Sequence, residues 1–483
     1  MTNSNDESER HDQNRREFLR NVGLFGAAAL AGPAVLAACG SSSKSTSNTS
    51  AGGATTTAAG GASTTAAGGA ATTAAGGAAT TAASGGSAAK VADLPTILGI
   101  DSANAAAGKD FPLASVLALS GTGSFYGKTM SRGIDLAVKH IAAAGGPNIK
   151  VKYWDHKSGD AAAGKQAMVE IIAGKYPAKL ASYADDLFVM TPDTTANKIF
   201  TFDGGGGTSI PNQGKDYFWG TRAITPNDPL PGLFRWWKEN NPGKVKVGLT
   251  GWDVGAASNA IIKTDILKKI ADAGLTFNNL YELFPPGNQD FSQVLPKVQA
   301  NEPDLLLAGM YGQDPGSFVN QSSTAGLKAF IVGFEFTPDG VNASKGSYDS
   351  AGWTFAYDYF DSNNPVSPLA KLFVSEFKAA YTDAPDFYAA NFYENTLNMW
   401  QLISRVTKKG GNILSGTDLQ TALTDNLTLT SVYGGDASKA GTYSLDPKTH
   451  SVLKRTMGVF QYKGGKVTPA VYFDIAGADY RKA

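Results

Sequence analysis

Cysteine, histidine and net charge are all scarce in this sequence, and each shortage excludes a class of function. Cys39 is the only cysteine among 483 residues, so the chain has no intrachain disulfide, no thiolate metal cage and no CxxC pair. Lys plus Arg and Asp plus Glu both number 42, which gives a formal net charge of zero and no basic field to attract nucleic acid. We therefore expect no nucleic-acid partner.

The few histidines also argue against a metalloenzyme. They are His11, His140, His156 and His450, which lie far apart in the sequence and show no HExxH spacing. A GxSxG nucleophile motif is missing as well. We expect no metal, no cofactor and no catalytic residues.

The first 38 residues have the features of an export signal. The paired Arg15 and Arg16 precede an apolar run over 22–38, a pattern that predicts a twin-arginine signal peptide. The run ends in LAAC, which resembles the lipobox of bacterial lipoproteins, where the cysteine, here Cys39, carries the lipid. The alternative is a retained membrane helix, for which about 17 residues interrupted by glycines and Pro33 are short. We expect an extracytoplasmic protein anchored to the cell membrane through Cys39.

A tether follows over residues 39–92. It consists almost entirely of Ala, Gly, Ser and Thr, with loose repeats such as TTAAGGA. Such residues cannot bury enough apolar area to offset the entropy lost on ordering. The composition predicts a disordered leash, with the folded part beginning near Asp93.

The remaining chain alternates between strand and helix patterns, and its 42% hydrophobic content suffices for a large core. Helical spacing is clear at Met130, Ile134 and Ile141, with Gly145 as a stop, and over 256–273 and 288–300. The expected strands are 113–119, 151–155, 198–202, 244–250, 304–310 and 330–334. This alternation predicts the α/β class, with two doubly wound Rossmann-like lobes before and after about Thr225. The tail over 431–473 predicts strands and hairpins.

The glycine-rich loop LSGTGSFYG at 119–127 follows a strand and precedes a helix, the setting of a dinucleotide site. Gly121 and Gly123 fit the first two fingerprint positions, but Tyr126 occupies the third, where a small residue is needed. The Gly204 to Gly207 run lacks the Lys and Ser/Thr pair of a P-loop. These loops are better suited to holding another small ligand at the carboxyl ends of strands.

The segment LSGTGSFYGKTMSRGIDLAVKHIAAAGG resembles the first loop and helix of the type I periplasmic binding proteins, in the branched-chain amino acid binding group. The segments 287–336 and 373–403 continue the resemblance in the same order, and it covers about 111–473. It implies two lobes joined by a three-strand hinge that closes on a ligand. Lobe 1 would comprise 93–224 plus 337–430, and lobe 2 would comprise 225–336 plus 431–483.

The resemblance also implies site residues. It assigns an aromatic contact to Tyr126, with Phe125 beside it, another to Tyr311, and pairing with a ligand ammonium to Glu335. Ordinary packing of the two tyrosines, and a solvated loop or internal ion pair for Glu335, are the alternatives.

Two further loops would bind a ligand carboxylate in that family. One matches 205–208 and contributes Gly206 and Thr208. The other falls at 182–186, where Tyr183, Asp185 and Asp186 replace the usual Gly and Ser pair. Two acids would repel a carboxylate and favour a second amino group, an amide or a metal, unless one of them caps the following helix.

Together these observations predict an extracytoplasmic solute-binding lipoprotein of an ABC importer. It would capture a small polar solute, an amino acid or amide-like compound, and deliver it to the importer's membrane subunits. The alternatives are a membrane-tethered ligand sensor and a lipid-anchored enzyme. The candidate ligand-binding residues are Phe125, Tyr126, Tyr183, Asp185, Gly206, Thr208, Tyr311 and Glu335.

Overall fold

The computed structural model describes residues 88–121, 123–182, 184–205, 215–223 and 226–483, with backbone alone at 184–188 and 257. These residues belong to one unit of the chain, 80–483. The predicted signal, Cys39, almost all of the predicted tether, Tyr183, Gly206 and Thr208 lie outside the described residues. Nothing in the structure therefore bears on those predictions.

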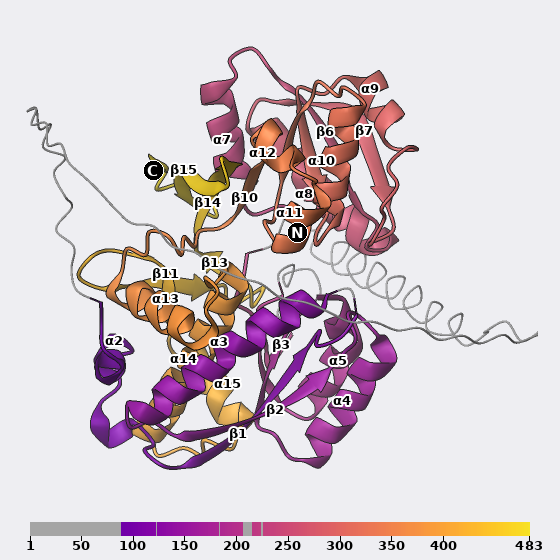
Figure 1. Ribbon diagram of the computed structural model, residues 1–483. Coiled ribbons are helices and arrows are strands. Elements are labelled where there is room, and N and C mark those ends of the chain that lie inside the picture. The colour runs from indigo at the N-terminus through magenta and orange to yellow at the C-terminus, as the bar shows by residue number, and fades with distance from the viewer. Residues whose placement is uncertain (1–87, 122, 183, 206–214, 224–225) are drawn as a thin grey trace, which may run out of the picture. The chain divides into compact units, whose positions relative to one another are not determined.

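The first lobe is built on a parallel five-stranded sheet with the order β2-β1-β3-β4-β5 (Figure 1). Apolar clusters lie on both of its faces, one shared with α3 and α14 and one shared with α4 and α5. The strands are β1 Asp110–Leu117, β2 Asn148–Asp155, β3 Ala178–Ala181, β4 Phe200–Asp203 and β5 Phe218–Gly220. The helices are η1 Val91–Asp93, α2 Leu94–Ile97, η2 Ser102–Asn104, α3 Ser124–Ala143, α4 Ala161–Ala173, α5 Ala184–Ala196, α13 Pro368–Tyr381, α14 Phe387–Lys408 and α15 Gly416–Thr424.

The second lobe repeats this plan in an eight-stranded sheet with the order β16-β15-β14-β10-β9-β8-β6-β7. Its β7-β6-β8-β9-β10 part is parallel and has the same order as the first sheet, and antiparallel strands extend it beyond β10. Its strands are β6 Lys246–Trp252, β7 Thr276–Phe284, β8 Leu305–Gly309, β9 Phe330–Gly333, β10 Thr354–Asp358, β14 Thr456–Lys463, β15 Lys466–Asp474 and β16 Arg481–Lys482. Its helices are α7 Leu230–Asn240, α8 Ala256–Asp272, α9 Leu295–Asn301, α10 Asp314–Thr324, α11 Pro338–Ala343 and α12 Ser347–Ala351.

Apolar clusters again cover both faces of this second sheet, through α7 and α8 on one side and α9 and α10 on the other. A sheet buried on both faces needs near-continuous apolar strands, and β8, with the sequence LLLAG, is of this kind. The predicted α/β class with two doubly wound lobes is therefore confirmed.

A small third sheet, β11-β12-β13, affects where the lobes divide. Its strands are β11 Thr428–Gly435, β12 Ala440–Leu445 and β13 Val452–Lys454, and their apolar side chains join the core around α13 and α14 in the first lobe. In contrast, β10 pairs with β9 and β14, so its backbone groups are satisfied in the second lobe. The chain crosses between the lobes three times, first between β5 and α7, then after β10, and last near Arg455. The second and third of these crossovers differ from the expected divisions at 337 and 431.

All six expected strands are present, with ends shifted by a few residues, and the expected tail hairpins correspond to β11–β15. The strand β3 was not predicted because it has four residues and carries Lys179, which is fully buried. The ammonium group of Lys179 donates to the Thr194 hydroxyl, and burial lowers its pKa to about 7. A buried lysine in a central strand contradicts the usual hydrophobic pattern.

Several helices begin at side-chain caps that the sequence supplies. Asp160, Ser367, Asp386 and Ser415 each accept a hydrogen bond from a backbone N–H in the first turn of the following helix. The helix α3 ends where Gly145 adopts a φ of 80°, which agrees with the predicted stop. In the part of the chain that the structure describes, none of the helices combines the length and the apolar composition needed to span a bilayer.

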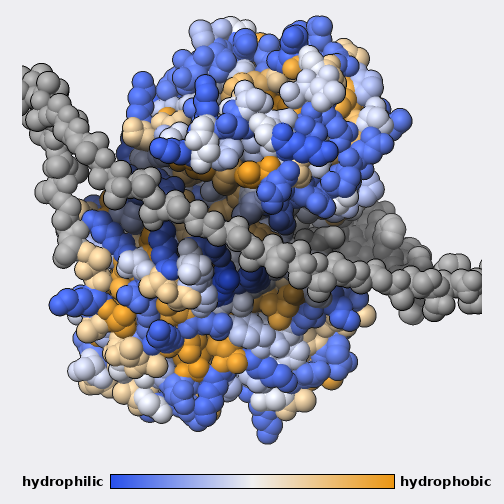
Figure 2. Space-filling model, in the orientation of Figure 1, coloured by the Kyte–Doolittle hydropathy of each residue, from blue (hydrophilic) through white to orange (hydrophobic). Residues whose placement is uncertain are grey.

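The surface view shows mostly hydrophilic side chains, with apolar patches on the lower lobe (Figure 2). The large apolar side chains with the highest exposed fractions are Val169, Leu453 and Leu414, on three separate segments. Isolated apolar side chains of this kind are ordinary for a protein surface.

Gly127 positions the start of α3 against the end of β1. A Cβ atom at this position would lie 1.9 Å from the carbonyl oxygen of Ala118. No side chain fits there, so the glycine sets the close approach of helix and strand that orients Tyr126, its neighbour in the chain.

Gly127→Ala is expected to lower the free energy of unfolding by about 1–3 kcal/mol, because the added methyl group must push α3 away from β1. The matched control is Gly164→Ala in α4, where the nearest side-chain atom to the added Cβ is 3.7 Å away. This control should be neutral or stabilising because Ala favours helix over Gly. Urea unfolding followed by circular dichroism measures both variants. Equal stabilities would contradict the close-packing argument.

Candidate functional site

The shared strand order places the ligand-binding edge of each lobe at the carboxyl ends of its parallel strands. In an open α/β sheet the order reverses beside the first strand, and the loops at this point diverge to leave a crevice. In the first lobe the point lies between β1 and β3, and in the second between β6 and β8. The loops of interest therefore follow β1 and β3 in one lobe and β6, β8 and β9 in the other.

Tyr126 and Glu335 bring two of these loops into contact. Tyr126 lies in the first turn of α3, and its hydroxyl donates to Glu335 Oε1 over 2.6 Å. Tyr388, near the start of α14, donates to the same oxygen over 3.2 Å, and its ring lies edge-on to that of Tyr126. The N–H of Gly312, after β8, donates to Glu335 Oε2 over 3.0 Å. Two residues expected at the site from the sequence are thus direct partners.

The carboxyl group of Glu335 is almost completely buried, with 3% of the residue exposed. Burial raises its pKa to about 7, although the hydrogen bonds from Tyr126, Gly312 and Tyr388 and the positive charge of Arg222 oppose this shift. Of the alternatives, the solvated loop is wrong. Glu335 has partners inside the protein, and they are hydrogen-bond donors rather than an oppositely charged group in an ion pair. Near neutral pH both the charged and the protonated form of this carboxyl group are present. It can therefore pair with a cation or donate a hydrogen bond.

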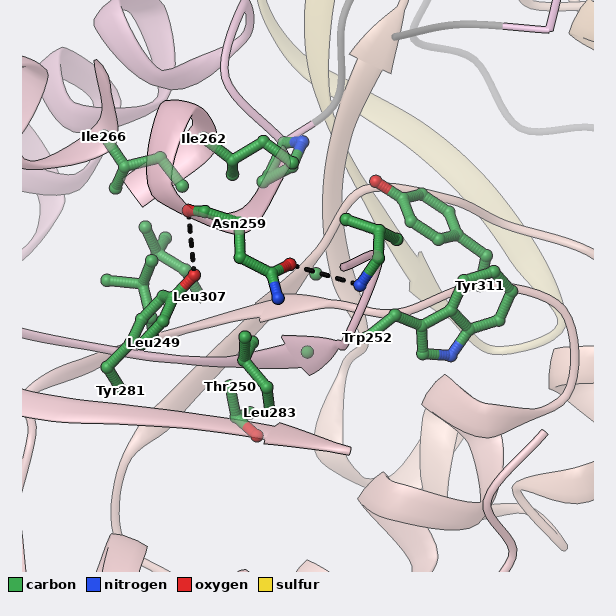
Figure 3. A pocket seen from close by; sticks show the side chains of 14 residues that line it. Leu249, Thr250, Trp252, Asn259, Ile262, Ile266, Tyr281, Leu283, Leu307 and Tyr311 are labelled. Atoms are coloured by element: carbon green, nitrogen blue, oxygen red, sulfur yellow. Dashed lines mark hydrogen bonds between the residues drawn. The ribbon is translucent and has the colours of Figure 1, made fainter. Parts of the chain in front are cut away.

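Tyr311 directly precedes Gly312, and its side chain lines an apolar pocket of the second lobe (Figure 3). Its ring lies edge-on to Trp252, with 5.2 Å between the ring centres. The cavity measures about 90 Å³ and lies between the end of β6 and helix α8. It is lined by Pro226, Leu249, Thr250, Gly251, Trp252, Val254, Asn259, Ile262, Ile266, Tyr281, Leu283, Leu307, Gly309 and Tyr311.

Hydrogen bonds hold one wall of this pocket in place. The Tyr281 hydroxyl donates to the carbonyl oxygen of Asn259 over 3.2 Å, and Asn259 Oδ1 accepts from the N–H of Val254 over 3.1 Å (Figure 3). These bonds position the first turns of α8 above β6. The walls toward the cavity are mainly aliphatic and aromatic, so the pocket suits a small apolar group.

Phe125 faces a second cavity, of about 450 Å³, which both lobes line. Phe125 and Thr129 come from α3, Phe336 from the loop after β9, and Phe387 from the start of α14. Phe125 therefore lines this cavity, whereas the adjacent Tyr126 bonds to Glu335.

In the first lobe, Asp155 organises the loop after β1. It accepts from the N–H of Leu119 over 2.9 Å and from the Ser120 hydroxyl over 2.5 Å. Ser158 adds to this order, since its Oγ accepts from the N–H of Gly123 over 2.8 Å. Burial would raise the pKa of Asp155, but these hydrogen bonds outweigh it and the pKa is lowered. Asp155, which ends β2 as a ribose-binding acid would, is used here to shape the loop.

The loop after β3 is joined to the loop after β2 by a buried polar pair that the sequence did not indicate. Ser182 Oγ lies 3.3 Å from His156 Nε2, and both residues are fully buried. Asp185 and Asp186 follow in the first turn of α5, where negative charge suits the helix dipole. Their positions inside the helix differ from the expected capping position, and their side chains lie outside the described residues.

The tryptophans of the two lobes differ in their surroundings. Trp154, Trp219 and Trp353 are buried in the cores, and Trp252 lines the pocket beside Tyr311. Among the residues described, no group of three or more His, Cys, Asp and Glu side chains could hold a metal ion. Sequence analysis missed Tyr388 and Arg222. In the sequence, Tyr388 is marked by the helix cap at Asp386 and Arg222 by its place between the two lobes.

A family comparison decides the class of protein. The sequence model described as "Periplasmic binding protein" matches residues 111–466. The chain belongs to this family. Its members are extracytoplasmic solute-binding proteins and not enzymes, and the resemblance drawn from the loop and helix motifs is confirmed.

Individual relatives agree with this assignment. The Leu/Ile/Val-binding protein homolog 8 of Brucella abortus is 23% identical over 300 residues, which is 57% of this chain and 71% of the relative. The leucine-binding protein LivK of Thermotoga maritima has a similar structure, with a TM-score of 0.64, 17% identity, and coverage of 75% of this chain and 98% of that one. A solute-binding protein of Rhodopseudomonas palustris in complex with benzoate gives a TM-score of 0.62, 19% identity, and coverage of 77% and 98%.

Tyr126→Phe is expected to destabilise the protein by about 1–2 kcal/mol at pH 8, because Glu335 is then charged and loses its shortest hydrogen bond. Tyr388→Phe should cost less, since its bond is longer. Tyr359→Phe is the control, because it removes a hydrogen bond of 3.2 Å between two uncharged tyrosine hydroxyl groups. Denaturant unfolding gives all three values. A Tyr126→Phe protein as stable as the control would contradict the assigned strength of this contact.

Proposed function

We propose that this protein captures a small solute between its two lobes and delivers it to the membrane subunits of an ABC importer. The observation that supports this most is the buried hydrogen bond between Tyr126 and Glu335, since it joins a loop of one lobe to a loop of the other at the expected ligand edge. Closure of two such loops around a guest is how a hinged binding protein retains it. In this proposal the solute is released chemically unaltered.

The proposed ligand-binding residues come from both lobes. Glu335 would pair with a positively charged amino group, and Tyr311 would contact the solute beside the apolar pocket. The remaining proposed contacts are Phe125, Tyr126, Tyr183, Asp185, Gly206 and Thr208. An acidic Asp185 in place of a carboxylate-binding group favours an amide or a second amino group over a second carboxylate.

The chemistry of these groups supports an amino acid or amide-like solute that carries a small apolar group. A buried carboxylate favours an ammonium partner, and the pocket of about 90 Å³ has room for a compact aliphatic group. Similar proteins have been solved with isoleucine and with benzoate, so this fold accommodates both aliphatic and aromatic acids in other chains.

We further propose that lipid on Cys39 anchors the protein outside the cell membrane, with residues 39–92 as the tether. Acyl chains on a single cysteine contribute about 0.8 kcal/mol per buried CH₂ group, so two or three chains give a stable anchor. In this arrangement the tether lets the folded part reach the importer.

The solute can be identified directly. The purified protein is denatured, released small molecules are identified by mass spectrometry, and each is titrated back by calorimetry together with L-leucine, asparagine and benzoate. A tight complex with an unaltered compound, and binding of the loaded protein to importer subunits, are expected. Turnover of the compound, or association with a signalling partner in place of an importer, would support the enzyme or sensor alternatives.

The affinity for an amino-bearing solute is expected to fall as the pH decreases from 8 to 6, by at most about tenfold per pH unit. The reason is that Glu335, with a pKa of about 7, gains a proton over this range and loses the charge that attracts an ammonium group. Glu335→Gln should bind weakly with a flat pH profile. A flat profile in the unmodified protein would argue against the pairing of Glu335 with a cation.

Replacement of Cys39 by Ala is expected to move the protein from the membrane fraction to the soluble extracytoplasmic fraction. Labelling of growing cells with a radioactive fatty acid provides the second measurement, since only the unmodified chain should carry the label. Label on the Cys39→Ala protein, or its retention in the membrane, would contradict the lipid anchor.

A further inference from the structure

Four buried charged side chains meet where the chain crosses between the lobes. Arg222 lies in the first crossover, Asp358 ends the strand that leads into the second, and Arg455 lies in the third. Arg222 Nε donates to Asp358 Oδ2 over 2.6 Å, and Arg455 Nε lies 3.7 Å from Asp358 Oδ1. Arg455 Nη2 donates to Glu394 Oε1 over 2.6 Å and to the carbonyl oxygen of Thr221 over 2.5 Å. The crossovers are thus tied together by charge-assisted hydrogen bonds.

Aromatic rings cover both guanidinium groups. Arg222 lies 4.5 Å from the ring centre of Phe387 and 4.8 Å from that of Tyr388. Arg455 lies 4.5 Å and 4.3 Å from the rings of Tyr433 and Tyr443. A guanidinium is weakly hydrated and favours the faces of such rings, which reduces the cost of burying it.

The two arginines differ in what lies beyond their rings. The Tyr388 ring under Arg222 carries the hydroxyl that donates to Glu335, whereas the Tyr433 hydroxyl beyond Arg455 donates to the carbonyl oxygen of Phe387. A continuous path of contacts therefore runs from Asp358 through Arg222 and Tyr388 to Glu335. Arg455 itself bonds to Glu394, and its path through Tyr433 ends on the backbone carbonyl of Phe387 rather than on the Tyr388 hydroxyl.

The charged and titratable groups around Glu335 come from several elements. Tyr126 faces it from α3, Tyr388 from α14 and Tyr348 from α12, and Arg222 acts on it from the first crossover. Burial raises the pKa of Asp386, the cap of α14, and the charge of Arg222 is one of the interactions that oppose this shift. Arg222 thus contributes a positive charge that favours the ionised form of Glu335, whereas Tyr126, Tyr388 and Gly312 favour it through hydrogen bonds.

We propose that Arg222 is a positioning residue of the binding site, which from the hinge holds Tyr388 against Glu335 and favours the charged form of this carboxyl group before a solute binds. The proposal rests on the proposed function, since it assigns a role at the same site. A solute ammonium would then meet a charged partner that is already in place. It also gives a physical link between the crossovers and the site, because the group that ties two crossovers together also prepares Glu335.

The test follows the titration of Glu335 in the full chain without any solute. Glutamate labelled with ¹³C at the side-chain carboxyl is incorporated, and Glu335→Gln identifies the resonance. Arg222→Met should move the midpoint of the Glu335 titration upward by about one pH unit or more. Arg222→Lys, which restores a positive charge, should bring the midpoint back toward that of the unmodified protein.

Arg455→Met is the matched control. Arg455 is equally buried, also contacts Asp358 and also lies on aromatic rings, so a general loss of hinge structure would appear in both variants. We expect both Met variants to lose stability, and only Arg222→Met to shift the Glu335 midpoint. If either Met variant fails to fold, Arg222→Gln and Arg455→Gln replace the pair, since a Gln side chain is uncharged but keeps an amide that can donate a hydrogen bond to the buried acids. An unchanged midpoint in the Arg222 variant, or an equal shift in both, overturns the proposal.

A calorimetric titration with L-leucine keeps this proposal distinct from the proposed function. If L-leucine binds, Arg222→Met should lose at least about fivefold in affinity at pH 7 and recover it at pH 9, where Glu335 is mainly ionised in both proteins. Loss of the same size at both pH values would show that Arg222 has only a structural role. If L-leucine and the other solutes all fail to bind the unmodified protein, the proposed function fails, and the carboxyl titration still decides the role of Arg222.

Discussion

The burial of one carboxylate between the lobes is the constraint around which the site is arranged. A buried ionisable group is costly unless hydrogen bonds or a charge satisfy it, and Glu335 has both. Its donors come from α3, from α14 and from the loop after β8, so they meet only when both lobes are folded. A group that needs partners from both lobes makes the local energy depend on how the lobes meet.

The crossovers solve a related problem with two arginines and two acids. Arg222 and Arg455 are balanced by Asp358 and Glu394, and all four are almost completely buried. Such pairs contribute little net stability, because their attraction is largely offset by desolvation. Their geometry is demanding, however, and this makes them suited to hold three chain segments in one arrangement. The aromatic rings beneath the guanidinium groups continue this arrangement into α14.

The two lobes contribute different chemistry to the candidate site. In the first lobe, Asp155 and Ser158 use hydrogen bonds to shape the loop after β1, and Ser182 pairs with His156. In the second lobe, Trp252 and other apolar side chains leave a small pocket beside Tyr311. Polar groups fix directions, whereas an apolar pocket selects by size and shape. The first lobe would orient a solute held between them, and the second lobe would select it by size and shape.

The sequence alone determined the α/β class, the repeated lobes and the identity of the loops that matter. The class and the lobes follow from hydrophobic periodicity, which is a local property, and the loops follow from the resemblance to the type I periplasmic binding proteins. Only the tertiary structure decided that Tyr126 and Glu335 are hydrogen-bonded partners, that Tyr311 lines a separate pocket and that Arg222 lies behind Tyr388. Burial, partners and pKa depend on residues that lie between 23 and 209 positions apart at Glu335, and no pattern within a short window contains that information.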